Sequence, residues 1–206
     1  MKFIKKLALI IFLLTTFIIV SAISYVTAVS NNISESVFRL HVIANSDSDE
    51  DQQLKYIVRD NLIQYMNTLT QNITSKEAAI KIAKEHEKDF YDIAVKTIKD
   101  NGYDYDVKVE IGNSYFPTKY YGDISLPAGY YDALKVEIGE SAGRNWWCVM
   151  FPPLCFVDMS TGIVPDDSKK IMKDNMPEEE YALISENKTN TNLNLKFKLI
   201  ELFYKH

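Results

Sequence analysis

The chain has 206 residues, a formal net charge of −5, and hydrophobic and aromatic fractions of 47% and 12%. This length accommodates one ordinary domain and a further segment, and the apolar fraction is sufficient to build a core. The mildly acidic charge, without a basic stripe, argues against nucleic acid as a partner, and seven glycines and six prolines exclude collagenous and low-complexity classes.

An apolar run near the N-terminus predicts export from the cytoplasm. Residues 7–29, LALIIFLLTTFIIVSAISYVTAV, are uncharged and come after three lysines in the first six residues. A basic flank before such a run directs the rest of the chain across the membrane. The run fits a signal peptide cut at Ala28, in the small-residue sequence VTA, and equally a retained anchor, since about 20 apolar residues span a bilayer. We therefore expect a signal peptide or transmembrane anchor at 1–29, a linker at 30–36 and an extracytoplasmic domain at 37–206.

The periodicity of the remaining chain predicts an α+β domain. Residues 37–45 alternate like a strand, whereas residues 54–69 and 76–99 carry apolar side chains at spacings of three and four, which is typical of amphipathic helices. From residue 103 the period changes to two and predicts three or four antiparallel strands. The order β-α-α-β-β-β indicates two helices packed on an antiparallel sheet. Within residues 168–184, Pro177 and the glutamate-rich turn after it suggest the start of a short helix, and the tail from residue 192 fits a strand running into a helix or a single helix.

An acidic loop comes after the first strand. Residues 47–51, DSDED, begin like a calcium-binding loop but lack its glycine at position six and its acid at position twelve, where Gln52 and Val58 stand. The simpler interpretation is a helix N-terminus capped by Ser48 or Asp49. The three histidines are too isolated for a zinc site. We expect no metal and no cofactor.

Motifs for catalysis are sparse. The chain holds no G-x-S-x-G elbow, P-loop or G-x-G-x-x-G fingerprint. His41 and Cys148 could form a Cys–His pair, because such partners meet in space and not in sequence. That pair defines the alternative of an extracytoplasmic cell-wall hydrolase. No orienting residue or oxyanion motif can be attached to it by spacing, so the sequence favours a protein that is not an enzyme.

The stretch GRNWWCVMFPPLCFVD, residues 143–158, holds both tryptophans, both cysteines and two adjacent prolines. If the segments before and after Pro152 and Pro153 are extended, the prolines lie at the bend, because proline cannot donate to a sheet ladder. Such a hairpin would bring Cys148 and Cys155 within range of a disulfide, which an extracytoplasmic location permits. The alternative is two buried free thiols.

The neighbouring tryptophans are expected to point to opposite faces of a strand. One can pack in the core, and the other must then be exposed or covered by helices or by a partner. Tryptophan and arginine are typical anchors of protein interfaces, although an ordinary two-sided core strand is also consistent. The candidate partner-binding residues are Arg144, Asn145, Trp146, Trp147, Phe151, Pro152 and Pro153.

Two blocks and their order resemble the stage II sporulation protein R family. They are FRLHVIANSDSDEDQQLKYIVRDNL at residues 38–62 and NWWCVMFPPLCFVD at residues 145–158. The run LPAGYYDALKVEIGESAGRNWW, residues 126–147, also fits the family's pattern. Together these blocks cover most of residues 37–158, and the last forty or so residues carry no motif that matches.

The resemblance implies an exported signal of endospore formation. Members of the family are made in the forespore and exported into the space between the two membranes around it, so this chain is expected there, secreted or membrane-anchored. The implied partner is a membrane-embedded aspartic protease of the mother cell, which removes the pro-sequence of sigma-E. The implied role is activation of that protease, without catalysis by the chain itself. A structural scaffold of the spore envelope is a further alternative.

Overall fold

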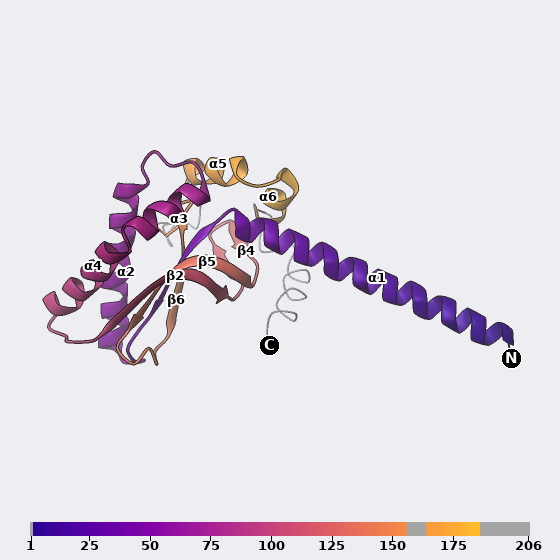
Figure 1. Cartoon of the computed structure of the whole chain (residues 1–206), viewed down its shortest axis with the longest axis horizontal. Coiled ribbons are helices and arrows are strands. Elements are labelled where there is room, and N and C mark those ends of the chain that lie inside the picture. Colours follow the sequence, from indigo (N-terminus) through magenta and orange to yellow (C-terminus); the bar gives the residue numbers. More distant parts are fainter. Residues whose placement is uncertain (1, 156–163, 186–206) are drawn as a thin grey trace.

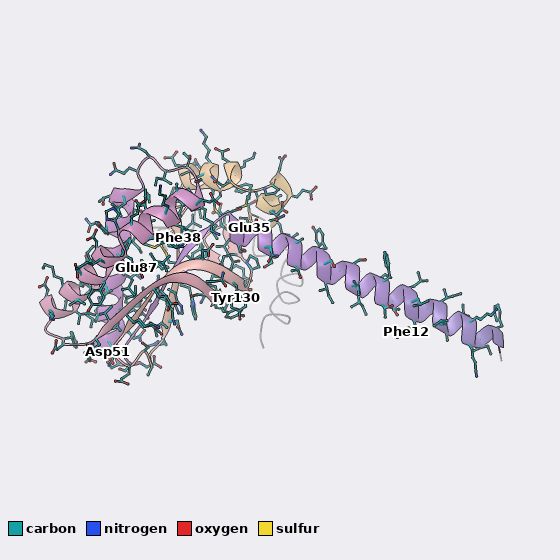
Figure 2. The ribbon with its side chains drawn as sticks, in the orientation of Figure 1. Phe12, Glu35, Phe38, Asp51, Glu87 and Tyr130 are labelled. Carbon is teal, nitrogen blue, oxygen red and sulfur yellow. A yellow bond between two sulfur atoms is a disulfide. The ribbon has the colours of Figure 1, made fainter. Side chains whose placement is uncertain are left out.

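Helix α1 (Lys2–Glu35) extends away from the rest of the molecule as a single rod (Figure 1). The structure is a computed structural model that describes residues 2–155 and 164–185. Most side chains before residue 29 are exposed, and Figure 2 shows Phe12 far from the domain. Within the described residues this is the one helix long and apolar enough to cross a membrane, a test that a signal sequence also satisfies. At 1.5 Å per residue, the run 7–29 is about 35 Å long, which is enough for a bilayer core of about 30 Å.

The segment 30–36, expected as a linker, instead continues helix α1 as far as Glu35. Ile33 is fully buried, where the end of α1 contacts strand β5 and helix α6. The side-chain amide of Asn32 donates to Glu180 Oε1 at 2.8 Å. A polar sequence without glycine or proline does not break a helix, and burial of its apolar side chains stabilises the added turns. The long helix is thus joined to the domain by a packed turn.

The main sheet has four strands in the order β2-β5-β1-β6. The pairs β2·β5 and β1·β6 are antiparallel, as expected, whereas β1 and β5 are parallel. A parallel pair needs a long crossover, and here the whole segment between the two strands provides it. The fold is therefore α+β with a mostly antiparallel sheet. Its strands are β1 (Phe38–Ile43), β2 (Val107–Phe116), β5 (Gly129–Ile138) and β6 (Asn145–Phe151).

Three helices cover one face of this sheet: α2 (Asp49–Leu69), α3 (Lys76–Glu85) and α4 (Glu87–Asp100). Their buried side chains form a core with alternate residues of β1, β5 and β6. The predicted second helix is interrupted at His86, which leaves the helical conformation with φ −109° and ψ 18°. The His86 Nδ1 atom is 2.9 Å from the Tyr65 hydroxyl of α2 and 2.7 Å from Asp89 Oδ2.

The opposite face of the sheet is also covered, which the sequence did not indicate. The hairpin of β3 (Lys119–Tyr121) and β4 (Ile124–Leu126), the end of α1, and helices α5 (Asp166–Asp174) and α6 (Glu178–Ser185) form this layer. Figure 1 shows α5 and α6 beside the base of α1. The tail expected as a strand or helix after residue 192 lies outside the described residues.

Candidate functional site

The loop before β6 is fixed to the end of β1. The Gly143 N–H donates to Ala44 O at 3.0 Å, and the Arg144 N–H donates to Asp47 Oδ1 at 2.6 Å. A Cβ atom on Gly143 would lie 2.1 Å from the backbone oxygen of Ser46, so only glycine permits this approach. The run 126–147 is therefore joined here to the block 38–62, and these contacts set the position at which β6 begins.

The acidic loop takes part in the same junction. Ser48 caps α2 by accepting a hydrogen bond from the Asp51 N–H at 3.2 Å, which confirms the predicted helix cap. Asp51 Oδ2 accepts hydrogen bonds from Asn45 Nδ2 and Ser46 Oγ at 2.8 and 2.6 Å. Burial raises the pKa of Asp51, but these hydrogen bonds outweigh burial and hold it below its usual value. The carboxylate thus joins the end of β1 to the start of α2.

The two tryptophans lie on opposite faces of β6, as their alternation predicted, and both are half-buried. Trp146 faces the helical layer. The Tyr56 ring packs edge-on against it with centroids 5.3 Å apart, and the Arg59 guanidinium lies 4.4 Å from the centre of the indole. A cation over the face of tryptophan is attracted by the ring quadrupole. Trp146 is therefore held by two side chains of α2.

Trp147 is held in the same manner on the other face. The ring of His41 stacks on it with centroids 5.7 Å apart, and Lys119 Nζ lies 4.2 Å from the indole centre. The Tyr121 hydroxyl donates to the backbone oxygen of Trp147 at 3.3 Å. Neither tryptophan is fully buried or fully exposed, since each ring has one face on the domain and a cation over it.

A cleft of about 340 Å³ runs along this border of the sheet, and we call it the edge cleft. Three cations line it, and the described residues of its lining include no carboxylate. Two hollows of about 480 and 590 Å³ occur on the helical layer, but their linings mix carboxylates with aliphatic side chains and include no tryptophan. The edge cleft is lined by Gln52, Lys55 and Tyr56 from α2, by Lys119, Tyr120 and Tyr121 from β3, and by Arg144, Asn145, Trp146 and Trp147.

One of the three cations of the edge cleft, Lys55, is poorly solvated. Lys55 is 1% exposed, and its ammonium donates to Gln52 Oε1 at 2.6 Å and to Arg144 O at 3.0 Å. Burial, followed by repulsion from Arg144 and Arg59, lowers the pKa of Lys55 to about 8. Both partners of the ammonium are neutral oxygens, which makes it a cation without a contacting carboxylate among the described residues.

A further cation, Arg39, lies behind the lining of the cleft. Arg39 is fully buried, and its guanidinium lies 4.0 Å from the centre of the Phe116 ring and 4.6 Å from that of Tyr131. Its Nη2 atom donates to the Tyr121 hydroxyl at 2.5 Å, while Nη1 has no acceptor among the described residues. Burial first and the charge of Arg39 second lower the pKa of Lys119. The aromatic rings thus hold the guanidinium of Arg39 in the interior of the domain.

Three of the predicted partner-binding residues do not belong to this surface. Phe151 is 2% exposed within the core, Pro152 is buried, and Pro153 lies on the turn after β6. A side chain inside the core cannot contact a partner, so Phe151 and Pro152 are corrected to structural residues. The structure brings together the other four, Arg144, Asn145, Trp146 and Trp147.

The two cysteines form a disulfide across this turn, with Cα atoms 5.5 Å apart. The bond also overturns the suggested Cys–His pair, because a disulfide sulfur is not a nucleophilic thiolate. The register gives a second reason: Cys148 lies opposite Leu40 and faces the helical layer, whereas His41 lies opposite Trp147 and faces the other layer. The second extended segment expected after Leu154 falls largely on residues outside the described ranges.

The cationic and aromatic contributions of α2 and β3 were missed by the sequence reasoning. The spacing of Tyr56 and Arg59 places them on one helical face, and the sequence TKYYGD around Lys119 combines a cation with aromatic residues at a turn. Nothing in either pattern indicates contact with a strand some 30 to 90 positions further along the chain.

The edge cleft lies toward the end of the domain that is remote from α1. Strand β1 begins just after α1 and runs away from it, and the start of β6 pairs with the last residues of β1, Asn145 with Ile43 and Trp146 with Val42. Figure 2 shows Tyr130 near the base of α1 and Asp51, beside the β1–α2 junction, at the opposite end.

These features define a class of protein: an α+β domain carried by an N-terminal apolar helix, with an aromatic and cationic cleft along the free edge of its sheet. Comparison with known proteins identifies the family. The sequence model of stage II sporulation protein R matches residues 34–161, and the Stage II sporulation protein R of Bacillus subtilis (strain 168) is 36% identical over 180 residues, covering 82% of this chain and 80% of the relative. The chain belongs to the stage II sporulation protein R family. No solved structure matches it.

Proposed function

We propose that this sporulation protein is an exported signal. It is made in the forespore, crosses the inner of the two surrounding membranes through residues 7–29, and acts in the space between them, secreted or anchored. There it activates a membrane-embedded aspartic protease of the mother cell, which then processes the sigma-E precursor. In this proposal the chain is a ligand of the protease and is not itself catalytic.

The position of the edge cleft relative to α1 carries the proposal. A signal that leaves one membrane and acts on a protein in the facing membrane needs its recognition surface directed away from its own anchor. The cleft meets this condition, because it lies along the distal part of β1 and β6 while α1 leaves from the other end of the sheet. The exposed apolar surface of α1 supports passage into or across a membrane.

Coproduction in a bacterium that does not form spores tests the proposal. The chain, the protease and the sigma-E precursor are produced together, and shortening of the precursor is monitored by immunoblot. We expect shortening with the full chain and none with a version lacking residues 2–28, which cannot be exported. An unrelated export signal placed before residue 29 should restore shortening. Equal shortening without any export signal, or none with the full chain, would contradict the proposed function.

A further inference from the structure

We propose that the edge cleft binds an acidic peptide segment by accepting its carboxylates between Lys119 and the pair Lys55 and Arg144. The identification of that segment as part of the protease's extracytoplasmic region rests on the proposed function. The peptide chemistry itself is argued from the cleft alone.

Charge is the first argument. The whole chain has a formal net charge of −5, yet within the part of the chain that the structure describes the lining of this cleft carries three cations and no carboxylate. Arg144 is paired with Asp47, whose Oδ1 lies 3.5 Å from Arg144 Nε, and both side chains of this pair are about two-thirds exposed. An exposed pair of this kind contributes little and exchanges readily with a competing anion. The cleft is therefore a cationic surface on an acidic protein.

Desolvation is the second argument. Lys55 and the guanidinium of Arg39 are buried without a contacting carboxylate among the described residues. A cation removed from water gains more from an incoming carboxylate than a solvated one, since the local dielectric is lower. Lys119 and Arg59 are held over the indole rings at 4.2 and 4.4 Å. This cation–π contact fixes their direction. Arg59 is also paired with Asp60 at 2.7 Å, whereas Lys119 has no contacting carboxylate among the described residues.

The backbone of β6 excludes a different mode of peptide binding. An edge strand can add a further strand through its outward carbonyl and amide groups. Here the Trp147 oxygen accepts from the Tyr121 hydroxyl at 3.3 Å, and the Val149 oxygen accepts from the Leu154 N–H at 3.2 Å. Two outward positions of the edge are thus occupied within the chain, which favours recognition through side chains.

The fold also distinguishes a peptide from a lipid surface. A membrane that holds α1 would lie at the end of the domain opposite the cleft, because α1 leaves from there. The site is a cleft walled by tryptophan and tyrosine rings, which suits a segment that enters between them, whereas a flat headgroup layer is met by an exposed basic face.

Intrinsic fluorescence provides the test, because the two tryptophans of the chain both line the cleft. The full chain in neutral detergent micelles is titrated with a hexaglutamate peptide and, separately, with hexaglutamine. We expect a saturable change with hexaglutamate alone. Lys119→Gln combined with Arg144→Gln should weaken binding about tenfold or more, whereas Lys81→Gln with Lys84→Gln, on the exposed surface of α3, should leave it unchanged.

Three results would overturn the inference: no change with hexaglutamate, equal weakening by both double variants, or a stronger response to inorganic phosphate or to anionic vesicles than to the peptide. Circular dichroism checks that the variants are folded. If a double variant does not fold, the two single substitutions are tested in its place.

Coproduction with the protease separates this inference from the proposed function. If the double variant Lys119→Glu, Arg144→Glu promotes processing as well as the wild type does, the cleft assignment is wrong and the proposed function stands. If hexaglutamate binds but the wild type never promotes processing, the function is wrong and the cleft assignment stands.

Discussion

Trp146 and Trp147 show what single residues contribute to this molecule. Their alternation along a strand is a local property, and it correctly predicts opposite faces. The surroundings of each ring are not local: Arg59 comes from α2 and Lys119 from β3. The sequence therefore located part of the candidate site, its strand, and could not supply the cations that give the site its charge. Phe151 was misassigned for the same reason, since its burial depends on helices far away in the sequence.

His41 packs against Trp147 of the cleft and makes the free energy of unfolding depend on pH. It is 8% exposed, its Nε2 atom lies 2.7 Å from Asn145 Oδ1, and its ring stacks on Trp147. Burial lowers the pKa of His41 below 6.5, and the charges of Lys135 and Arg39 act in the same direction, against Asn145 and the charge of Glu137. Below pH 6.5 the unfolded chain binds a proton that the folded chain excludes, so the free energy of unfolding falls as the pH drops.

We predict that His41→Gln reduces this loss of stability. Glutamine retains a donor for Asn145 but does not titrate. Urea unfolding of the wild type and the variant at pH 7 and pH 5 measures the effect. The difference in unfolding free energy between the two pH values should be smaller for the variant. An equal or larger difference would mean that His41 is not a source of the acid sensitivity.

At the scale of elements, strongly periodic segments were predictable. Strand β1, helix α2, and the alternating strands β2 and β5 can be inferred directly from the spacing of apolar residues. The break between α3 and α4 was not predictable, because the apolar pattern runs through it with Ala83 and Phe90 both buried. The contact of Tyr65 with His86 forms only when α2 is in place. The parallel pair β1·β5 depends likewise on the course of the intervening segment.

The last turns of α1 were expected to be a linker, but in the structure they pack against the domain. Ile33 is fully buried and Val29 is 7% exposed. Lys76 Nζ donates to the Ser34 oxygen at 2.9 Å and pairs with Asp132 Oδ2 at 2.7 Å. A cut at Ala28 would leave all of these contacts with the domain.

We predict that a domain beginning at residue 29 is more stable than one beginning at residue 37. Removing the buried Ile33 alone should cost about 2–5 kcal/mol, the usual range for loss of a large aliphatic core side chain. Urea unfolding of the two versions compares their unfolding free energies. The full chain in detergent serves as the control and should match the version that begins at residue 29. Equal stability of the two shortened versions would show that the turn does not contribute.

At the scale of the whole molecule, the two functional parts lie at opposite ends. The apolar helix leaves one end of the sheet (Figure 1). The edge cleft lies along the first residues of β6, which pair with the last residues of β1. Sequence composition alone predicted an N-terminal apolar segment and a separate domain, but their relative direction requires the sheet order, in which β6 is the last strand, beside β1. This polarity is the property that an anchored signal needs in order to reach across a gap.

Site-specific crosslinking tests most directly that the edge cleft contacts the protease. Tyr120 in the cleft and Tyr91 on α4 are equally exposed, at 42% and 43%, and α4 packs beside β2 at the other border of the sheet. A photoreactive benzoylphenylalanine replaces each tyrosine in turn in cells that also produce the protease, and processing of the sigma-E precursor verifies that each variant is active. We expect a crosslink to the protease from position 120 and none from position 91. A crosslink from position 91 alone, or from neither position while processing continues, would show that the edge cleft does not contact the protease.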